Sequence, residues 1–320
     1  MVGIVILNYN NSKDTIACVN SVLKYIDVQF KLLLVDNGST NKAVTDELIN
    51  YVTTLESSYS CKVLEDTNAL ALKQINLLLL PTNIGYARGN KQGLSMIYND
   101  SEIDYIMILN NDILFTCPIV GNLINILEKI EDAFLVSPLL FKRDGKTIDY
   151  TCARNNYSIN EFFCCYIFKY FDIFGINKRI YKKNHVLLNS PKLICEKMIE
   201  IEMPSGSCFV TRKGDFFAIG DFDPNTFLYC EENILSKKIQ CIKKKSFLIP
   251  SQTCIHLGGS TTSQSLSSFI AKCSRDSILY YIKNYTSIHP ISYSLFKLLV
   301  NVDYFKVCIS NNIKKLCAIR

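Results

Sequence analysis

The feature that most constrains the fold is a set of short, continuously apolar segments, each of which ends at a cluster of polar residues. The clearest is Tyr105–Leu109, which is followed at once by Asn110, Asn111 and Asp112. A segment without a polar face predicts a strand that is buried on both sides, as in a parallel sheet. Ligands of open α/β sheets bind just beyond the carboxyl ends of the strands, so this polar cluster is a candidate binding site.

Three earlier segments have the same form and predict strands over residues 2–7, 30–35 and 77–80. The polar clusters that follow them are Asn8–Ser12, Asp36–Thr40 and Pro81–Asn90. A helical pattern comes after each cluster, and this alternation predicts βαβ units around a mostly parallel sheet flanked by helices. The four polar clusters should therefore lie along one edge of the sheet, where a nucleotide could bind.

Individual residues in these clusters suit the binding of a nucleotide. Asp36 could accept hydrogen bonds from a pyrimidine N–H or a ribose hydroxyl, although it could equally be a turn former. Gly85 and Gly89 would let the backbone approach a ligand closely, and Arg88 could pair with phosphate oxygens or be an ordinary solvated arginine. The chain has no G-x-G-x-x-G after its first strand and no G-x-x-x-x-G-K-[ST], which argues against a dinucleotide enzyme and a P-loop NTPase.

The second half of the chain supplies two adjacent acids, Glu231 and Glu232, just before a predicted helix at 234–238. Acids at a helix start can simply complement the helix dipole. Alternatively, one of them is a general base that takes the proton of an attacking hydroxyl group. Because only one of two neighbouring side chains usually points inward, we expect Glu232 to be the base, with Glu231 as the second choice.

Two residues are candidate metal ligands. Asp112 could supply a carboxylate oxygen to a divalent cation, and a histidine is the second candidate. His256 follows a predicted short strand at Ser246–Ile249 and precedes Gly258 and Gly259 in a loop of small residues. A lone histidine is more often structural, but such a loop suits a site that closes over substrate, and a neutral imidazole could join Asp112 around a metal ion. His185 and His289 lack such surroundings and are interpreted as structural.

Taken in order, these segments resemble an inverting family 2 glycosyltransferase with the GT-A fold, most like the rhamnosyltransferase type. The matching segments are Leu7–Asn10, Val35–Ser39, Asn83–Asn90, Leu109–Asp112, Gly206–Val210, Ile219–Asp223, Glu231–Glu232 and His256–Ser260. They cover roughly the first 260 residues. No single motif is very specific, but unrelated chains seldom carry the whole set in this order.

The resemblance implies a role for each residue. Asp36 would recognise the base, Asp112 would bind Mg²⁺ or Mn²⁺ at the position of the family's D-x-D motif, and His256 would bind the metal or the diphosphate. The implied nucleotide-sugar site is Asn8, Tyr9, Asn10, Asp36, Asn83, Gly85, Arg88, Asn110 and Asn111, and the implied acceptor site is Gly206, Ser207 and Asp223. The chain departs from the family pattern at two positions. Asn110 stands in place of the first aspartate of D-x-D, and Glu232 stands in place of the aspartate that is usually the base.

The implied reaction is a single displacement at the anomeric carbon, with inversion, from a UDP- or dTDP-sugar to a glycan or lipid-linked saccharide of surface polysaccharide synthesis. Two other functions stay open. A sugar-nucleotide nucleotidyltransferase would share the crevice and the metal, but it would want a loop with glycine and lysine where Asn8–Ser12 has neither. A non-catalytic scaffold subunit would keep the fold, and the departures at Asn110 and Glu232 leave room for it.

Composition limits the remaining choices. The net charge of +6 over 320 residues is too small and too evenly spread to indicate nucleic-acid binding. None of the fourteen cysteines forms a C-x-x-C pair and no signal peptide is recognisable, which predicts free thiols in a cytoplasmic protein without zinc. We expect a catalytic domain at 1–262, with a nucleotide-binding half at 1–115 and an acceptor half at 116–262, and a helical C-terminal extension at 263–320.

Two aromatic segments could touch a membrane surface, although no segment is apolar for long enough to span one. Phe162–Phe174 leads into the basic residues of Lys178–Lys183, and Ile291–Val307 is followed by Lys314 and Lys315. Aromatic residues beside lysines suit an interfacial helix that meets anionic lipid. Packing in the core is an equally good explanation, so a peripheral membrane contact is one of two interpretations.

Overall fold

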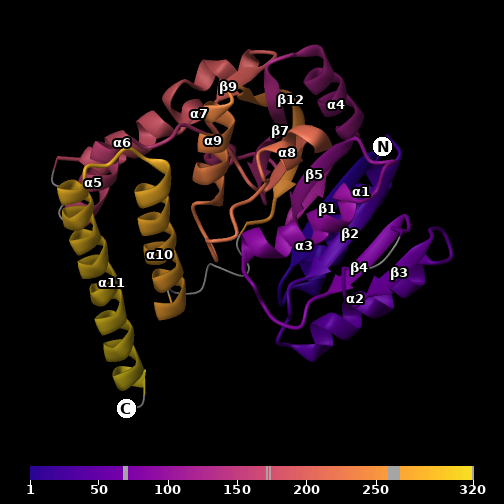
Figure 1. Ribbon diagram of the computed structural model, residues 1–320, viewed down its shortest axis with the longest axis horizontal. Helices are drawn as coiled ribbons and strands as arrows, with labels where there is room; N and C mark the ends of the chain where they lie inside the picture. The colour runs from indigo at the N-terminus through magenta and orange to yellow at the C-terminus, as the bar shows by residue number, and fades with distance from the viewer. Residues whose placement is uncertain (68–70, 171, 173, 259–266, 319–320) are drawn as a thin grey trace.

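The protein is built around one large mixed sheet that has helices on both faces (Figure 1). The computed structural model describes residues 1–67, 71–170, 172, 174–258 and 267–318. Along the sheet the strand order is β3-β4-β2-β1-β5-β11-β7-β12-β6, and β9 pairs with β12. The predicted α/β fold, with a mostly parallel sheet flanked by helices, is confirmed.

The first half of the chain forms the parallel part of this sheet. Its strands are β1 (Val2–Asn8), β2 (Phe30–Asp36), β3 (Cys61–Leu64), β4 (Ile75–Leu79) and β5 (Tyr105–Asn110). The strand predicted at 77–80 is β4, which begins two residues earlier. Strand β3 was not predicted because it lies at the sheet edge, where Lys62 and Val63 are exposed and only Leu64 is buried.

The second half adds strands of both directions. They are β6 (Ile113–Phe115), β7 (Ala133–Lys142), β9 (Ile199–Ile201), β11 (Cys208–Arg212) and β12 (Lys245–His256), besides a separate pair, β8 (Ala153–Arg154) with β10 (Met203–Pro204). Strand β11 lies antiparallel between β5 and β7, and β12 runs parallel to β7. The predicted strand at Ser246–Ile249 was too short because Pro250–Gln252, where the pairing register shifts, interrupts the apolar pattern.

Helices cover both faces, which explains why the strands lack a polar side. One face packs against α1 (Ser12–Tyr25), α2 (Lys42–Leu55) and α4 (Val120–Lys129), and the other against α3 (Tyr86–Tyr98), α8 (Lys213–Ala218) and α9 (Glu231–Cys241). In β1, Ile4 packs into the first core and Val5 into the second. A strand with alternating faces buried in two cores reads as a continuous apolar run.

A helical region lies at one end of the sheet (Figure 1). It contains α5 (Ile159–Ile167), α6 (Ile176–Asn184), α10 (Ser268–Tyr285) and α11 (Pro290–Ala318), whereas the short helix α7 (Val186–Asn189) packs against the sheet core through Leu187. Short 3₁₀ turns occur at Tyr150–Cys152 and Pro191–Cys195. A third core joins Ile234 of α9 to Tyr281 of α10 and Phe296 of α11. The predicted helical C-terminal region is confirmed, whereas the boundary expected near 262 falls outside the described residues.

The register of the central strands brings their polar ends together. Asn8 of β1 is paired with Asp36 of β2, and on the other side of β1 Leu7 is paired with Asn110 of β5. The clusters that follow β1, β2 and β5 therefore start at the same edge of the sheet, as predicted.

Two further predictions concern the cysteines and the membrane. Every cysteine whose side chain the structure describes is a free thiol. Among the described residues, no helix combines the length and the apolarity that crossing a bilayer requires.

Candidate functional site

A cavity of about 730 Å³ opens at the edge of the sheet where β1 and β5 end. Eight residues that the sequence singled out line it: Asn8, Tyr9, Asn83, Gly85, Asn110, Asn111, Asp112 and His256. The remaining lining residues are Leu7, Asn37, Tyr86, Phe227, Leu228, Ser267, Phe269 and Ile270. The wall is thus polar where the strands end and apolar where the 227–228 loop and the start of α10 meet it, which suits a ligand with both kinds of surface.

Strand pairing brings the two predicted metal ligands together although they are far apart in sequence. Asp112 lies in the turn between β5 and β6, and His256 is the last residue of β12, where it pairs with Ile113. The backbone N–H of Leu257 also donates to the carbonyl oxygen of Asp112, at 2.8 Å. As a result, His256 Nε2 lies 3.3 Å from Asp112 Oδ2.

A third residue, Asp149, orients this histidine from behind. Its Oδ2 lies 2.7 Å from His256 Nδ1, and its Oδ1 accepts hydrogen bonds from the backbone and the hydroxyl group of Thr151. Burial opposes charge on Asp149, but His256 and Thr151 outweigh it and lower the pKa of the carboxyl group to about 2. Burial also lowers the pKa of His256, yet the hydrogen bonds to Asp112 and Asp149 dominate and raise it to about 10.

The residues present fit a hard divalent cation. Asp112 Oδ1 is buried and has no hydrogen-bond partner, so the site holds a carboxylate oxygen that a ligand would satisfy. Mg²⁺ and Mn²⁺ accept carboxylate oxygens, and Mn²⁺ also accepts imidazole nitrogen. To coordinate an ion, His256 would have to release the Nε2 proton that its raised pKa favours while the ion is absent. Among the described residues, no group of three or more His, Cys, Asp or Glu side chains is arranged to hold a metal. An ion here would therefore complete its shell with oxygens of a bound ligand and of water.

Asp36, in contrast, is fully engaged with the protein. It is buried; its Oδ1 accepts hydrogen bonds from Asn8 Nδ2 at 2.9 Å and from the Ser39 hydroxyl, and its Oδ2 accepts one from the Thr45 hydroxyl at 2.8 Å. Asp36 is not among the residues that line the cavity. In the structure Asp36 orients Asn8, which lines the cavity. Recognition of a nucleotide base by Asp36 stays a prediction.

The loop before α3 is shaped by contacts within the protein. Asn37 Nδ2 donates to Asn83 Oδ1 at 3.1 Å and to the carbonyl oxygen of Gly85 at 3.2 Å. Gly85 has φ +89°, and a Cβ atom there would lie 2.4 Å from the carbonyl oxygen of Phe227. The close approach that the sequence predicted at Gly85 is therefore an approach to the 227–228 loop, which forms the opposite wall of the cavity.

Glu232 is held next to the cavity by two partners. Its Oε1 accepts a hydrogen bond from the Gly206 N–H and its Oε2 one from Arg154, each at 2.8 Å. Tyr86, which lines the cavity, donates its hydroxyl to the carbonyl oxygen of the same Gly206, at 2.8 Å. Burial, and then the charges of Glu232 and Glu231, raise the pKa of Tyr86, which places both acids close to this wall.

Glu231 has a different environment. It is buried, and its Oε1 has no hydrogen-bond partner. Burial is the main reason that its pKa rises to about 8. The two preceding residues, Tyr229 and Cys230, both have positive φ angles, an unusual backbone that persists only where the surrounding structure enforces it. The sharp corner at 229–230 sets the direction in which the two acids point.

The other predicted residues lie near the cavity but do not line it. Arg88 is exposed and donates to the carbonyl oxygen of Pro224, and Asn10 donates through its backbone to the Ser39 hydroxyl. Asp223 is buried and accepts hydrogen bonds from Tyr280 and Tyr285 of α10. Ser207 is also buried, and its hydroxyl accepts hydrogen bonds from Ser205 and, at 3.4 Å, from Asn110.

Several residues of the site were missed in the sequence. Asn37 and Tyr86 lie inside motifs that had been recognised, so their neighbours could have drawn attention to them. Asp149 and Arg154 lie in an irregular segment between β7 and α5, and their partners are about 80 or more residues away in the chain. Phe269 reaches the cavity from the C-terminal helices, a region for which no role in the site was expected.

Comparisons with known proteins agree with this geometry. The family model described as "Glycosyl transferase family 2" matches residues 3–216. A rhamnosyltransferase, WbbL of Escherichia coli (strain K12), is 22% identical over 234 residues, which are 70% of this chain and 82% of that protein.

Among solved structures, similar chains include GalNAc-T7 with UDP, GalNAc and Mn²⁺, at a TM-score of 0.58 and 14% identity, over 88% of this chain. The match spans 47% of the GalNAc-T7 chain, about half its length. S. aureus TarS 1–349 matches with a TM-score of 0.51 and 10% identity, over 95% of this chain and 72% of that one. At these identities the likeness concerns the fold.

Proposed function

The chain belongs to glycosyl transferase family 2 and is a glycosyltransferase with a GT-A fold, and we propose that it moves a sugar from a UDP- or dTDP-sugar to a saccharide acceptor with inversion. The observation that carries this proposal is Asp112, which lines a cavity large enough for a nucleotide sugar and has one buried carboxylate oxygen without a hydrogen-bond partner. The acceptor that we propose is a glycan or lipid-linked saccharide of surface polysaccharide synthesis, in line with the similarity to a rhamnosyltransferase.

In this proposal the polar edge of the sheet binds the donor. Asn110 and Asn111 offer amide groups to the nucleotide, while the buried amide of Asn8 is held by Asp36 and Thr15 and supports the edge behind them. The apolar wall at Phe227 and Phe269 excludes water from the other side. Asp112 and His256 would hold Mg²⁺ or Mn²⁺, and the structure of GalNAc-T7, which has a similar fold and contains Mn²⁺, supports this choice. When bound, such an ion neutralises the charge that develops on the leaving diphosphate.

Glu232 would accept the proton of the attacking hydroxyl group. Arg154 and the Gly206 N–H fix the direction of its carboxylate, which is the kind of positioning that proton transfer requires. Gly206 also links Glu232 to Tyr86 on the cavity wall, so an acceptor that reaches this wall would meet both. Glu231 is the weaker candidate because burial favours its protonated form.

Family membership favours transfer over the two alternatives, a nucleotidyltransferase and a non-catalytic subunit. The expected cytoplasmic location and the division into domains at residue 262 stay predictions.

The test is hydrolysis and transfer with a panel of UDP- and dTDP-sugars, each in Mn²⁺, Mg²⁺ or EDTA. We expect turnover to require a metal and to fall by about 10²–10⁴-fold in Glu232→Gln. Glu231→Gln is the matched control and should keep most of the activity, because it replaces an acid that burial already favours in the neutral form. The anomeric configuration of the product, read by NMR, tests inversion.

Two results would oppose the proposal. Loss of activity in Glu231→Gln with normal activity in Glu232→Gln would make Glu231 the base. Failure of the protein to bind or cleave any of these donors with either metal would exclude the proposed donors altogether.

A further inference from the structure

The last helix, α11, has apolar residues on two opposite sides. On the inner side, Phe296 and Val300 are buried in the core that α11 shares with α10 and α5. On the outer side, seven large apolar residues have exposed fractions between 44% and 75%. They are Ile291, Leu295, Leu298, Val302, Phe305, Ile309 and Ile313, and we call them the outer stripe.

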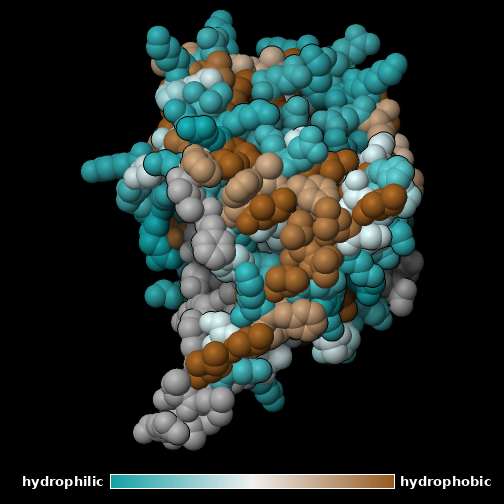
Figure 2. Space-filling model, turned by 90° about the vertical axis from the view of Figure 1, so that its left-hand side faces the viewer, coloured by the Kyte–Doolittle hydropathy of each residue, from teal (hydrophilic) through white to brown (hydrophobic). Residues whose placement is uncertain are grey.

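The outer stripe forms one continuous face of the helix. Its members are separated by three or four residues, a spacing that keeps side chains on the same side of an α-helix. From Ile291 to Ile313 the helix rises by about 33 Å, at about 1.5 Å per residue. Figure 2 shows hydrophobic side chains gathered on this side of the molecule.

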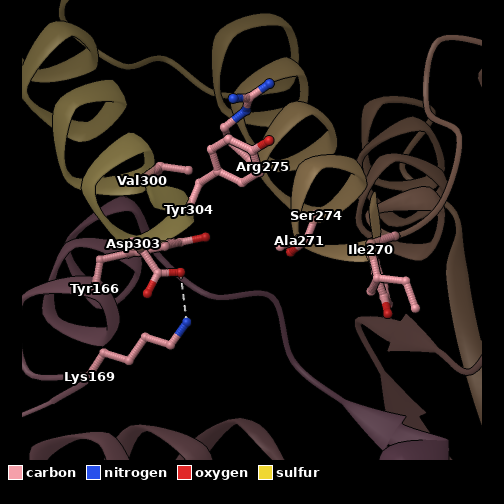
Figure 3. A pocket seen from close by; sticks show the side chains of 10 residues that line it. Tyr166, Lys169, Ile270, Ala271, Ser274, Arg275, Val300, Asp303 and Tyr304 are labelled. Carbon is pink, nitrogen blue, oxygen red and sulfur yellow. Dashed lines mark hydrogen bonds and ion pairs between the residues drawn. The ribbon is translucent and has the colours of Figure 1, made fainter. Parts of the chain in front are cut away.

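Contacts on the inner side fix the rotation of the helix. Asp303 of α11 accepts a hydrogen bond from Lys169 at 2.7 Å and one from the Tyr170 hydroxyl at 2.6 Å. On the α10 side, the Arg275 guanidinium lies 4.3 Å from the ring centroid of Tyr304 (Figure 3). Since these contacts and the buried Phe296 hold the inner side in place, the outer stripe cannot turn into the core.

The exposed charges of the described part of α11 are positive, and one of them, Lys306, borders the outer stripe. Lys297 and Lys306 are exposed, and the sequence of α11 continues with Lys314 and Lys315. Its one acid, Asp303, already forms an ion pair with Lys169. Lys306 Nζ also lies 4.1 Å from the ring centroid of Tyr170, so the cationic flank continues towards α5.

Neighbouring elements expose residues of the same kinds. Near the end of α5, Ile167, Tyr170 and Phe174 are exposed, although other aromatic residues of the same segment pack in the core. The next helix, α6, exposes Lys178, Arg179, Lys182 and Lys183. Exposed apolar and aromatic residues beside lysines and arginines are typical of surfaces that lie in the interface of an anionic membrane.

A second copy of the chain is the other occupant that such spacing could suit. Coiled-coil partners use apolar residues three and four apart, but they also need opposite charges on the flanks of the seam. The flanks of the outer stripe offer lysine, serine and asparagine and no free acid within the described part of α11. Two such helices would bring lysines together, whereas an anionic lipid surface would pair with them.

We propose that the outer stripe of α11 docks on an anionic lipid bilayer, with the helix parallel to the membrane plane. The apolar side chains would enter the boundary between headgroups and acyl chains, and the flanking lysines would meet lipid phosphates. This contact goes beyond the transfer reaction and does not depend on it. It would bring the enzyme to the surface at which a lipid-linked saccharide is found.

The test is flotation of the full chain with vesicles of phosphatidylcholine, with or without phosphatidylglycerol. We expect binding only when phosphatidylglycerol is present, and a decrease in binding as the salt concentration rises. Leu298→Ser/Phe305→Ser should weaken binding by roughly ten-fold or more, because it removes two buried apolar side chains. Lys297→Gln/Lys306→Gln should weaken it about five-fold per lysine.

Matched controls change the same kinds of residue elsewhere on the surface. Phe217→Ser/Ile242→Ser alters two exposed apolar residues on other helices, and Lys62→Gln/Lys146→Gln alters two exposed lysines. Both controls should bind vesicles as the wild type does, and all four variants should hydrolyse the donor at the wild-type rate in solution. Donor hydrolysis thus reports on the proposed function separately from membrane binding.

Two outcomes would overturn the proposal. In one, vesicles fail to bind the wild type, or bind the Leu298→Ser/Phe305→Ser variant equally well. In the other, sedimentation without lipid shows a dimer that this variant dissociates, which would assign the outer stripe to a second copy of the chain.

Discussion

Asp36 ends β2 and Asp112 follows β5, the strands on either side of β1, and both residues are shielded from solvent. Their carboxylates nevertheless have opposite surroundings. Both oxygens of Asp36 accept hydrogen bonds from side chains of the protein. Asp112 has His256 beside one oxygen and no partner for the other. One carboxylate therefore supports the structure of the edge, and the other is left for a ligand.

The difference has an energetic meaning. A buried polar atom without a partner costs about 1–3 kcal/mol, so an unpaired carboxylate oxygen on a residue that lines a cavity is a natural place for a bound ion. Glu231 shows the alternative, because its unpaired oxygen does not line the cavity and burial raises its pKa to about 8. An unpaired carboxylate can thus be satisfied by a cation or by a proton, and access to the cavity separates the two cases.

Replacing each aspartate with asparagine tests whether Asp112 and Asp36 have different roles, and the largest effect is expected at Asp112. Asp112→Asn keeps the shape but removes the negative charge, and we expect metal-dependent turnover to fall by at least about 10²–10³-fold. The melting temperature should change little, since no protein donor loses its partner apart from His256. Steady-state rates in saturating Mn²⁺ check the first expectation, and normal turnover would contradict it.

A second substitution sharpens the role of the histidine. Asp149→Asn should weaken Mn²⁺ binding by about 10–100-fold, because His256 loses the carboxylate that orients its ring. Titration calorimetry with Mn²⁺ and UDP measures this directly. Asp144→Asn, on the exposed turn before Asp149, is the control and should bind as the wild type does. Equal affinity in both variants would show that Asp149 does not position His256.

Asp36→Asn should act on stability more than on metal binding. An amide at this position would turn one acceptor into a donor that faces Asn8, Ser39 or Thr45. We expect the free energy of unfolding to fall by about 1–3 kcal/mol, measured by urea denaturation. Mn²⁺ affinity should stay close to that of the wild type, and a large loss of affinity without a loss of stability would give Asp36 a direct role in binding.

The last prediction concerns the pH dependence of stability and Glu231. Its pKa is about 8 in the folded protein and near 4.5 when unfolded, so between these values the folded chain holds a proton that the unfolded chain has released. Stability should therefore fall as pH rises through this range, by on the order of 1 kcal/mol per pH unit. Below about pH 6.5, the ordinary pKa of histidine, Glu231→Gln should remove this slope, whereas the exposed Glu131→Gln should keep it. Above that pH the raised pKa of His256 adds a slope of the same sign in all three proteins. Identical slopes in all three proteins would contradict the assignment.

Much of the polar edge of the sheet could be predicted, because short patterns in the sequence determine it. The apolar runs and the polar residues after them determine β1, β2 and β5, and the rule for parallel strands brings their ends together. The sequence also predicted that Asp112 and His256 lie together, because each belongs to a recognisable motif. Asp149 could not be predicted, since its partner is 107 residues away and no local pattern marks it.

The helical end was harder to predict for a physical reason. In Phe162–Phe174 and in α11, buried and exposed apolar residues occur in the same segment, and hydrophobicity alone cannot assign them to a side. Likewise, Phe269 and Ile270 reach the cavity from α10, so residues beyond the expected catalytic domain at 1–262 help to form its wall. Only the packing of α10 against α9 and α11 reveals this arrangement.

The most direct test of Asp112 as a metal ligand is calorimetry of UDP and dTDP binding. The titrations use the wild type, Asp112→Asn and Asp36→Asn, each with Mn²⁺ and with EDTA. We predict that the wild type and Asp36→Asn bind one of the two nucleotides only when Mn²⁺ is present, and that Asp112→Asn does not bind it. Binding by Asp112→Asn with the affinity and metal dependence of the wild type would contradict the claim that its unpaired oxygen marks the metal site.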